Sequence, residues 1–238
     1  MGTSAFYKCQ NLENIIIPDS VVSIGNSLFH TCSNLKTATI GTGVTAINTT
    51  MFQDCHELTN VIFLGDIKKI GIYSFTGCDN DNLVIDFSNC TEIPSFLDYQ
   101  GIIGKDVTFA DLAPPARILV PSVLYLDWIA HEDWVHLAAH IDVKATERLE
   151  FSPVSENGGQ VGYAVSRGSA TDTYIVIPKI HNDLPVTQIG SFENNNELIG
   201  IIIPNTITHI NNDAFSNCTS LTDIVIPDSV TSIGKAAF

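Results

Sequence analysis

The chain has 238 residues and a formal net charge of −15, and 45% of its residues are hydrophobic while only 16% are charged. This composition predicts a packed core rather than a disordered chain. The acidic excess excludes nucleic acids and anionic membranes from the expected partners, because like charges repel and no cluster of Lys or Arg offers an exception. No apolar run has the length of a membrane span, so we expect no membrane insertion.

Residues 1–4 are not expected to belong to a signal peptide. Residues 1–4 have neither the basic start nor the apolar stretch of a signal peptide, and they resemble a cloning remnant. The chain opens and closes inside a repeated pattern. We therefore expect a piece of a longer protein.

A pattern with a period of 23 residues organises most of the chain. Its markers are aromatic and sulfur-containing residues that recur at this spacing: Phe6, Phe29, Phe52 and Phe75, Cys9, Cys32, Cys55 and Cys78, and later Phe192, Phe215 and Phe238. A period of 20 to 50 residues is typical of a solenoid, in which each repeat contacts only its neighbours.

Each repeat combines a short strand with turns. The alternation around Ile15 and Ile17 has a period of two and predicts a strand with one buried face. Pro18 and Gly25 mark the turns that follow. The Ala-Phe-x-x-Cys stretch predicts one helical or 3₁₀ turn with the phenylalanine in the core. Stacked coils would share this core and pair their strands into a parallel sheet.

The first array ends in an irregular region. The period is lost between Cys90 and Ala116, and a short strand is expected at 117–121. Apolar spacing predicts a helix over 122–129 and a second helical turn around 134–141. We predict that residues 1–145 form a first array whose irregular cap covers about 91–145.

A second module is expected from residue 146. Apolar stretches at 149–151 and 162–165 flank Glu156-Asn157-Gly158-Gly159, which predicts a hairpin. New repeats follow, built on Ile201 and Ile203 and then on Ile224 and Ile226. We predict that 146–238 forms a hairpin cap and a second array that is truncated at its C-terminus.

The six cysteines are expected to be free thiols. Equivalent residues of stacked coils lie about 4.8 Å apart, whereas a disulfide needs Cβ atoms about 3.8 Å apart and tilted toward each other. A buried thiol ladder fits this geometry. No repeated His or Asp accompanies the cysteines as a base, and no phosphate loop or catalytic triad is recognisable, so we expect no enzymatic activity and no cofactor.

Other polar motifs have simpler interpretations than a ligand site. His136 and His140 have metal-ligand spacing, but we favour a solvated cap surface for them and for His131. Residues 79–82 could bind calcium but lack the frame of an EF-hand, so a turn is favoured. Glycosylation sequons begin at Asn48, Asn89 and Asn217.

The strand face opposite the core is the candidate binding surface. If Ile15 and Ile17 point inward, their neighbours on the strand point outward. The equivalent outward positions in other repeats form a stripe of Ile, Val, Thr and Asn: Asn14, Ile16, Thr37, Thr39, Asn60, Ile62, Gly200, Ile202, Asp223 and Val225. Aliphatic residues in an exposed row can mark a binding surface, although β-branched residues also simply suit strands.

The repeat resembles that of a known family. The stretch Leu-Thr-Asp-Ile-Val-Ile-Pro-Asp-Ser-Val-Thr-Ser-Ile-Gly at 221–234 is similar to the repeat of BspA-type (treponemal-type) leucine-rich repeat proteins. Three positions differ from the family's repeat. Gly41 and Leu64 stand where the repeat has proline, and Asn195 stands where it has cysteine. The resemblance implies an α/β leucine-rich-repeat solenoid, β-rich with parallel strands and short helical or 3₁₀ turns. It also implies a cell-surface or secreted location in host-associated bacteria or protists.

Two functional hypotheses follow. The first is a non-enzymatic adhesion module that binds a host or matrix protein or a glycan through the exposed sheet face, by shape and many weak contacts. The second is a structural unit that stacks head to tail into an array or filament, because the end of the chain runs in register into its start.

Overall fold

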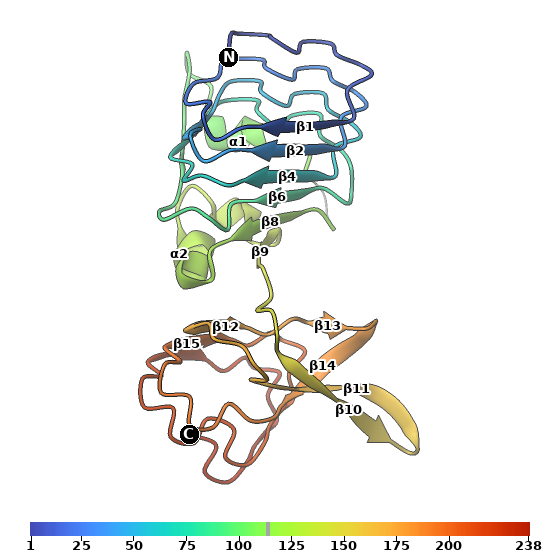
Figure 1. The fold of residues 1–238 in the computed structure, drawn as a ribbon, viewed down its shortest axis with the longest axis vertical. Helices are drawn as coiled ribbons and strands as arrows, with labels where there is room; N and C mark the ends of the chain where they lie inside the picture. Colours follow the sequence, from blue (N-terminus) through green and yellow to red (C-terminus); the bar gives the residue numbers. More distant parts are fainter. Residues whose placement is uncertain (113–114) are drawn as a thin grey trace. The chain divides into compact units, whose positions relative to one another are not determined.

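A computed structural model describes residues 1–112 and 115–238 of the chain. The chain divides into two compact units, Met1–Val143 and Lys144–Phe238. Figure 1 shows both units as stacked coils, and each is described by itself. The sequence placed this junction after residue 145.

The first unit is built on a six-stranded parallel sheet. Its strands, in spatial order, are β1 (Asn14–Ile17), β2 (Thr37–Ile40), β4 (Asn60–Phe63), β6 (Val84–Asp86), β8 (Arg117–Val120) and β9 (Ile141–Val143). Ile15 pairs with Ala38 and Ala38 with Val61, so each early coil advances by one 23-residue repeat. The first unit is therefore a solenoid with parallel strands and little helix, as the repeat predicts.

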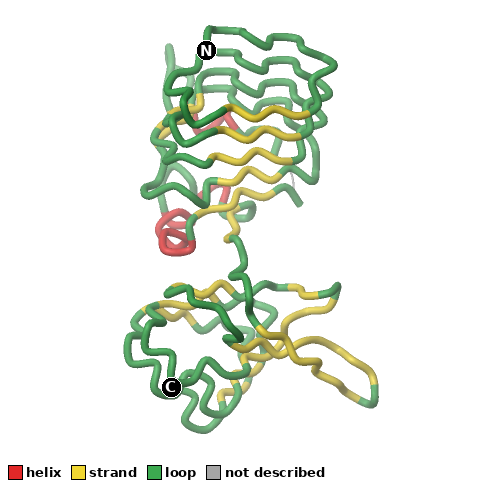
Figure 2. The backbone as a smooth tube through the Cα atoms, in the orientation of Figure 1, coloured by secondary structure: helices red, strands yellow, loops and turns green. Residues whose placement is uncertain are grey.

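A second, smaller parallel sheet is formed by another part of the same coils. It consists of β3 (Ala46–Ile47), β5 (Lys69–Ile70) and β7 (Ser95–Phe96). Ile47, Ile70 and Phe96 share one register. Figure 2 shows that turns and loops make up the rest of each coil. Two sheets joined by turns enclose the core from two directions.

The turn that carries each phenylalanine is not helical, so the prediction of a helical or 3₁₀ turn is wrong. In the second coil Ser27 and Thr31 have φ values of 58° and 61°, in the left-handed region that a right-handed helix excludes. The N–H of Phe29 donates to the carbonyl oxygen of Met51 in the next coil at 2.9 Å. A backbone ladder between coils therefore replaces the helix. Equivalent residues with positive φ are Ser4, Lys8, Thr50, Asp54, Tyr73 and Gly77.

Stacked phenylalanine rings run through the core of the first unit. The Phe29 and Phe52 rings lie 5.3 Å apart, and so do those of Phe52 and Phe75. Phe6 begins the stack, and Phe109 extends it at 5.2 Å from Phe75. The offset, nearly parallel rings combine apolar burial with favourable aromatic geometry.

The irregular region after the first repeats contains short helices and two further strands of the main sheet. The helices are α1 (Gly104–Thr108), η1 (Ser122–Leu124), α2 (Tyr125–Ala130) and η2 (Val135–Leu137). The helix expected over 122–129 is confirmed. The second helical turn is shorter than expected, because Ile141 belongs to strand β9. Trp128 and Trp134 are fully buried with ring centroids 4.5 Å apart.

The second unit begins with the hairpin expected from the sequence. Strands β10 (Glu150–Glu156) and β11 (Gly159–Ser166) pair antiparallel around Asn157 and Gly158, which both have positive φ. A second hairpin joins β13 (Ile180–His181) to β14 (Leu184–Ile189).

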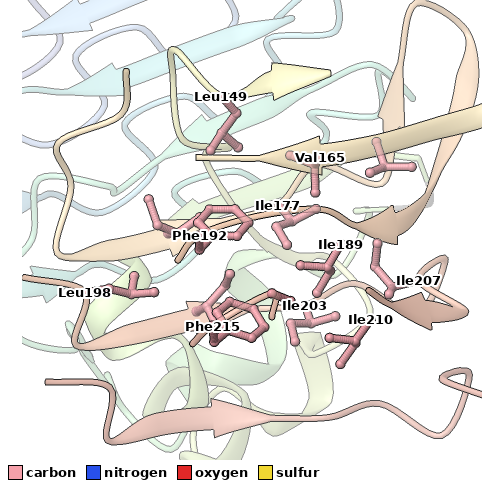
Figure 3. Packing of buried hydrophobic residues seen from close by; sticks show 14 of the residues in the cluster. Leu149, Val165, Ile177, Ile189, Phe192, Leu198, Ile203, Ile207, Ile210 and Phe215 are labelled. Atoms are coloured by element: carbon pink, nitrogen blue, oxygen red, sulfur yellow. The ribbon is translucent and has the colours of Figure 1, made fainter. Parts of the chain in front are cut away.

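Parallel strands from successive coils complete the second unit. One sheet orders β10, β11, β14, β16 (His209–Ile210) and β18 (Ser232–Ile233). The other orders β12 (Tyr174–Val176), β15 (Gly200–Ile202) and β17 (Asp223–Val225). Figure 3 shows the aliphatic and aromatic side chains between them. Phe192 and Phe215 stack at 5.6 Å, which repeats the core arrangement of the first unit.

Candidate recognition surface

The strand register of the main sheet aligns the outward side chains into two rows. Asn14, Thr37 and Asn60 are register partners and form one row. The second row begins with Ile16, Thr39 and Ile62 and continues through Asp86, Leu119 and Asp142. The sheet therefore brings together all six predicted site residues of the first unit. We call the face that these six residues form the outer sheet face.

The outer sheet face is mixed rather than continuously aliphatic. Ile16 is 74% exposed, whereas Thr39 and Ile62 are only partly exposed. Thr39 separates the two isoleucines, and Asp86 follows Ile62. Apolar contacts on this face are thus isolated and lie between groups that can hydrogen bond.

Polar groups on this face are partly paired with each other. The Thr37 hydroxyl donates to Asn14 Oδ1 at 2.7 Å. Beside this row, Lys36 Nζ lies 2.9 Å from Glu13 Oε2. The Oδ1 atom of Asn60 is buried and has no hydrogen-bond partner among the described residues. These bonds hold side chains in fixed positions, which lowers the entropy cost of an encounter with a partner.

The remaining predicted site residues lie in the second unit. Ile202 and Val225 are register partners on β15 and β17, and Val225 is 60% exposed. Gly200 is buried and offers no side chain. The Asp223 side chain lies outside the described part of the structure. The predicted stripe is therefore divided between two sheets in two units.

Cys32, Cys55 and Cys78 form the expected buried ladder of free thiols, whereas Cys9 and Cys218 are only partly buried. All six lie in the described ranges and none is in a disulfide. Cys55 Sγ donates to the carbonyl oxygen of Phe29 at 3.2 Å, and Cys78 Sγ to that of Phe52 at 3.1 Å. Burial raises the pKa of both thiols. Cys55 and Cys78 thus each link their coil to the preceding phenylalanine turn.

Thiol reactivity should follow this burial. We expect iodoacetamide at mildly alkaline pH to label the partly exposed Cys9 and Cys218 in the folded protein, and Cys55 and Cys78 only after unfolding, because the thiolate is the reacting form. Mass spectrometry of digested protein measures labelling at each site. Equal labelling rates for Cys55 and Cys9 in the native protein would contradict the ladder.

The histidines of the first unit's irregular region do not converge on one point. His136 Nε2 lies 3.1 Å from the Lys105 carbonyl oxygen, and His140 Nδ1 lies 3.0 Å from that of Ala116. His131 Nδ1 accepts from the Asp133 N–H at 3.2 Å. Within the described ranges, no three His, Cys, Asp or Glu side chains are grouped to hold a metal ion. Each ring instead bonds to the backbone of its own surroundings.

The sequon asparagines have structural roles. Asn89 Nδ2 donates to the carbonyl oxygen of Phe63 at 3.0 Å, and Asn217 Nδ2 donates to Asn194 Oδ1 at 3.0 Å. Asn48 Nδ2 donates to the carbonyl oxygen of Ile24. The nitrogen that would carry a glycan is thus bonded to a neighbouring coil in each case.

The acidic stretch 79–82 forms the expected turn. The N–H of Asn82 donates to Asn80 Oδ1 at 2.9 Å. Asp79 Oδ1 lies 2.9 Å from His56 Nδ1, and this hydrogen bond lowers the pKa of the Asp79 carboxyl. These groups are bonded to each other rather than arranged around a common centre.

Comparisons with known proteins give one family match. Residues 1–101 and 173–238 match the model described as BspA type leucine rich repeat region, in six copies. A search of curated proteins returned no match. Of the helices in the described residues, none is sufficiently long and apolar to cross a membrane.

Solved structures similar to this chain are bacterial leucine-rich repeat proteins. One from Bacteroides ovatus is 16% identical with a TM-score of 0.32, and the match covers 98% of this chain and 78% of that one. One from Eubacterium ventriosum is 21% identical with a TM-score of 0.31, over 93% of this chain and 56% of that one. A leucine rich cell surface protein from Faecalibacterium prausnitzii is 17% identical with a TM-score of 0.24, over 94% and 81%.

Proposed function

This chain belongs to the BspA-type leucine-rich repeat family, and we propose that it is a non-enzymatic recognition module. Its partner is a protein or a glycan, bound through the outer sheet face of the first unit. The module acts at the cell surface or after secretion, a location that rests on family membership alone.

The observation that carries the proposal is the regular outer sheet face. Its side chains repeat at the strand spacing of about 4.8 Å and alternate along each strand with the side chains of the buried core. Ile16 and Ile62 supply apolar contacts, while Asn14, Thr37 and Thr39 supply hydrogen-bonding groups between them. A surface of this kind binds through many individually weak contacts.

The buried thiols support a role in binding rather than chemistry. Burial raises the pKa of the Cys55 and Cys78 thiols. Both thiols donate hydrogen bonds to backbone carbonyl oxygens of the neighbouring coil. A thiol in this state is a structural group and a poor nucleophile. These cysteine thiols thus stabilise the stacking of neighbouring coils.

The test begins with a binding screen of immobilised matrix proteins and glycans, followed by variants measured against the molecules bound. We expect Ile16→Asp together with Ile62→Asp to weaken binding at least about tenfold, because a charge replaces each apolar contact. Val22→Asp is the matched control, since Val22 is 76% exposed and Ile16 is 74% exposed, but Val22 lies outside the sheet, in the loop after β1.

Folding must be checked separately from binding. Circular dichroism and thermal unfolding should be nearly unchanged in the double variant, because both positions are on the solvent side of the sheet. If the folded double variant kept wild-type affinity while Val22→Asp lost it, the binding surface would be on the loops beside the sheet and not on the sheet.

A further inference from the structure

The row of outward side chains that begins at Ile16 alternates between apolar and hydrogen-bonding groups across the whole main sheet. We call it the alternating row. Its register partners, in strand order, are Ile16, Thr39, Ile62, Asp86, Leu119 and Asp142. None of the six is buried. Alternation is not general in this chain, because the neighbouring register partners Ile202 and Val225 of the second unit are both apolar.

The repeat length of the alternating row can be compared with those of peptide conformations. Neighbouring strands lie about 4.8 Å apart, so its apolar groups recur about every 9.6 Å. Figure 1 shows β1, β2, β4 and β6 stacked as nearly parallel arrows, which keeps the row almost straight. A polyproline II helix has three residues per turn and advances about 9.3 Å per turn. Every third side chain of such a helix would therefore meet an apolar group.

Other peptide conformations fit this repeat less well. Two turns of an α-helix advance about 10.8 Å, which exceeds the repeat by about 1.2 Å. An extended strand presents one face about every 6.8 Å, which falls short of the repeat by about 2.8 Å. For polyproline II the difference is about 0.3 Å per turn. Three apolar contacts of a polyproline II segment therefore stay in phase from Ile16 through Ile62 to Leu119.

The acidic group at the centre of the alternating row is free to meet a cation. Asp86 Oδ1 accepts a hydrogen bond from the Ser88 N–H at 2.8 Å. Of the ion pairs within the described ranges, none includes Asp86. A basic side chain of a partner is thus attracted to a position between Ile62 and Leu119.

The cations on this side of the sheet are already paired. Arg117 Nη1 lies 3.8 Å from Asp142 Oδ2, at the last strand of the sheet. Lys36 Nζ lies 2.9 Å from Glu13 Oε2, beside the first strands. Asp86 is therefore the carboxylate of the alternating row whose charge is not offset by a neighbouring ion pair.

The parallel row of polar side chains can bond to the backbone of a docked segment. Asn14 precedes Ile16 by two residues on the same strand, about 6.8 Å away. Polyproline II makes no internal hydrogen bonds, so its carbonyl groups accept bonds from a partner. Thr37 donates to the side-chain oxygen of Asn14 at 2.7 Å. This bond uses the oxygen of Asn14 and not its N–H groups, which can donate to such carbonyl groups.

We propose that the alternating row docks a proline-rich segment of a partner protein in the polyproline II conformation. The segment carries an apolar side chain at every third position, which meets Ile16, Ile62 and Leu119, and a basic side chain that meets Asp86. This inference rests on the proposed function and names the partner of the same surface. A preformed polyproline II segment loses little entropy on binding. None of the six side chains is aromatic, so the row has no ring on which a sugar could stack.

The probe is a synthetic peptide of four Leu-Pro-Lys units, tested by fluorescence anisotropy at physiological ionic strength. One control has the same composition, but its order is permuted so that the leucines are not three residues apart. The other control replaces each lysine by glutamate. We expect the Leu-Pro-Lys peptide to bind at least about tenfold more tightly than either control, because only it matches both the repeat length and the charge.

Variants locate the binding on the molecule. Leu119→Ser and Asp86→Asn should each weaken binding of the Leu-Pro-Lys peptide about tenfold. Asparagine keeps an acceptor for the Ser88 N–H and removes only the charge, so Asp86→Asn should also reduce the dependence of binding on salt. Val22→Ser, which removes a 76% exposed apolar side chain outside the sheet, should not weaken binding. Thermal unfolding checks that each variant is folded.

Three results would overturn the proposal. The permuted peptide could bind as tightly as the Leu-Pro-Lys peptide, which would mean that net charge alone attracts it. The peptide could bind both folded variants as it binds the wild type. It could also fail to bind at millimolar concentration. If it failed while molecules from the matrix and glycan screen still lost affinity for the Ile16→Asp, Ile62→Asp variant, the proposed function would stand and the polyproline II partner would be wrong.

Discussion

Replacement of Phe52 by alanine is expected to lower the free energy of unfolding of the first unit by about 3–5 kcal/mol. Its ring is fully buried and stacks at 5.3 Å on both Phe29 and Phe75. Alanine would leave a cavity at the centre of the stack and remove two aromatic contacts. A loss of this size is a large fraction of the stability of an ordinary domain. Chemical denaturation followed by tryptophan fluorescence measures it, because Trp128 and Trp134 lie in this unit.

Phe6→Ala is the matched comparison. Phe6 is partly exposed, and among the described residues its ring stacks on that of Phe29 alone, at 5.5 Å. Its removal should cost roughly half as much as removal of Phe52, since an end ring loses one neighbour and less buried area. Equal losses for the two substitutions would mean that the stack is not the main source of cohesion between coils.

The two tryptophans of the first unit should respond differently to the same substitution. The indole N–H of Trp134 donates to the Pro94 carbonyl oxygen at 3.0 Å in a buried position. The indole N–H of Trp128 has no hydrogen-bond acceptor among the described residues. Trp134→Phe would leave a buried carbonyl without its donor, whereas Trp128→Phe would remove an unpaired donor. We expect Trp134→Phe to be less stable than Trp128→Phe by about 1–3 kcal/mol.

Thermal or chemical unfolding of both variants provides the measurement. Each loses a similar ring volume, so the difference between them reports the hydrogen bond more closely than either value alone. If Trp128→Phe were the less stable variant, packing around the two rings would outweigh the hydrogen bond to Pro94.

The repeat was predictable from the sequence because its signal is local. Alternating residues such as Ile15 and Ile17 have a period that only a strand satisfies, and the 23-residue spacing places equivalent strands side by side. Burial of phenylalanine and cysteine follows from the same spacing. Equivalent residues of stacked coils lie in one row along the solenoid, and an apolar row is buried in the shared core. The hairpin at Asn157 and Gly158 was also predictable, because its turn residues suit positive φ.

The conformation of the phenylalanine turn was not predictable in this way. Its left-handed positions are occupied by ordinary residues such as Ser27, Thr31 and Tyr73, which carry no preference for positive φ. Hydrogen bonds between coils hold these residues there, and such bonds form only after stacking. A local pattern therefore suggested a helical turn where tertiary contacts impose another conformation.

The candidate surfaces were predicted only in part. Strand alternation identifies outward positions, but exposure depends on neighbouring side chains, so Ile62 is more covered than Ile16. The short hairpin in which Tyr99 pairs with Ile102 was missed because loss of the repeat at 90–116 was interpreted as irregular chain. The available signal was the sequence spacing from Phe96 to Phe109, which is longer than the spacing from Ile70 to Phe75. This spacing indicates an insertion only when both phenylalanines are assigned to their positions in the coil.

Sedimentation velocity over a wide range of protein concentration tests most directly whether the chain is a module for recognising other molecules. A recognition module predicts a single species of 25.8 kDa at every concentration. Mass that rises steadily with concentration, without a closed end state, would contradict this function. It would favour the alternative in which copies of the chain stack end to end.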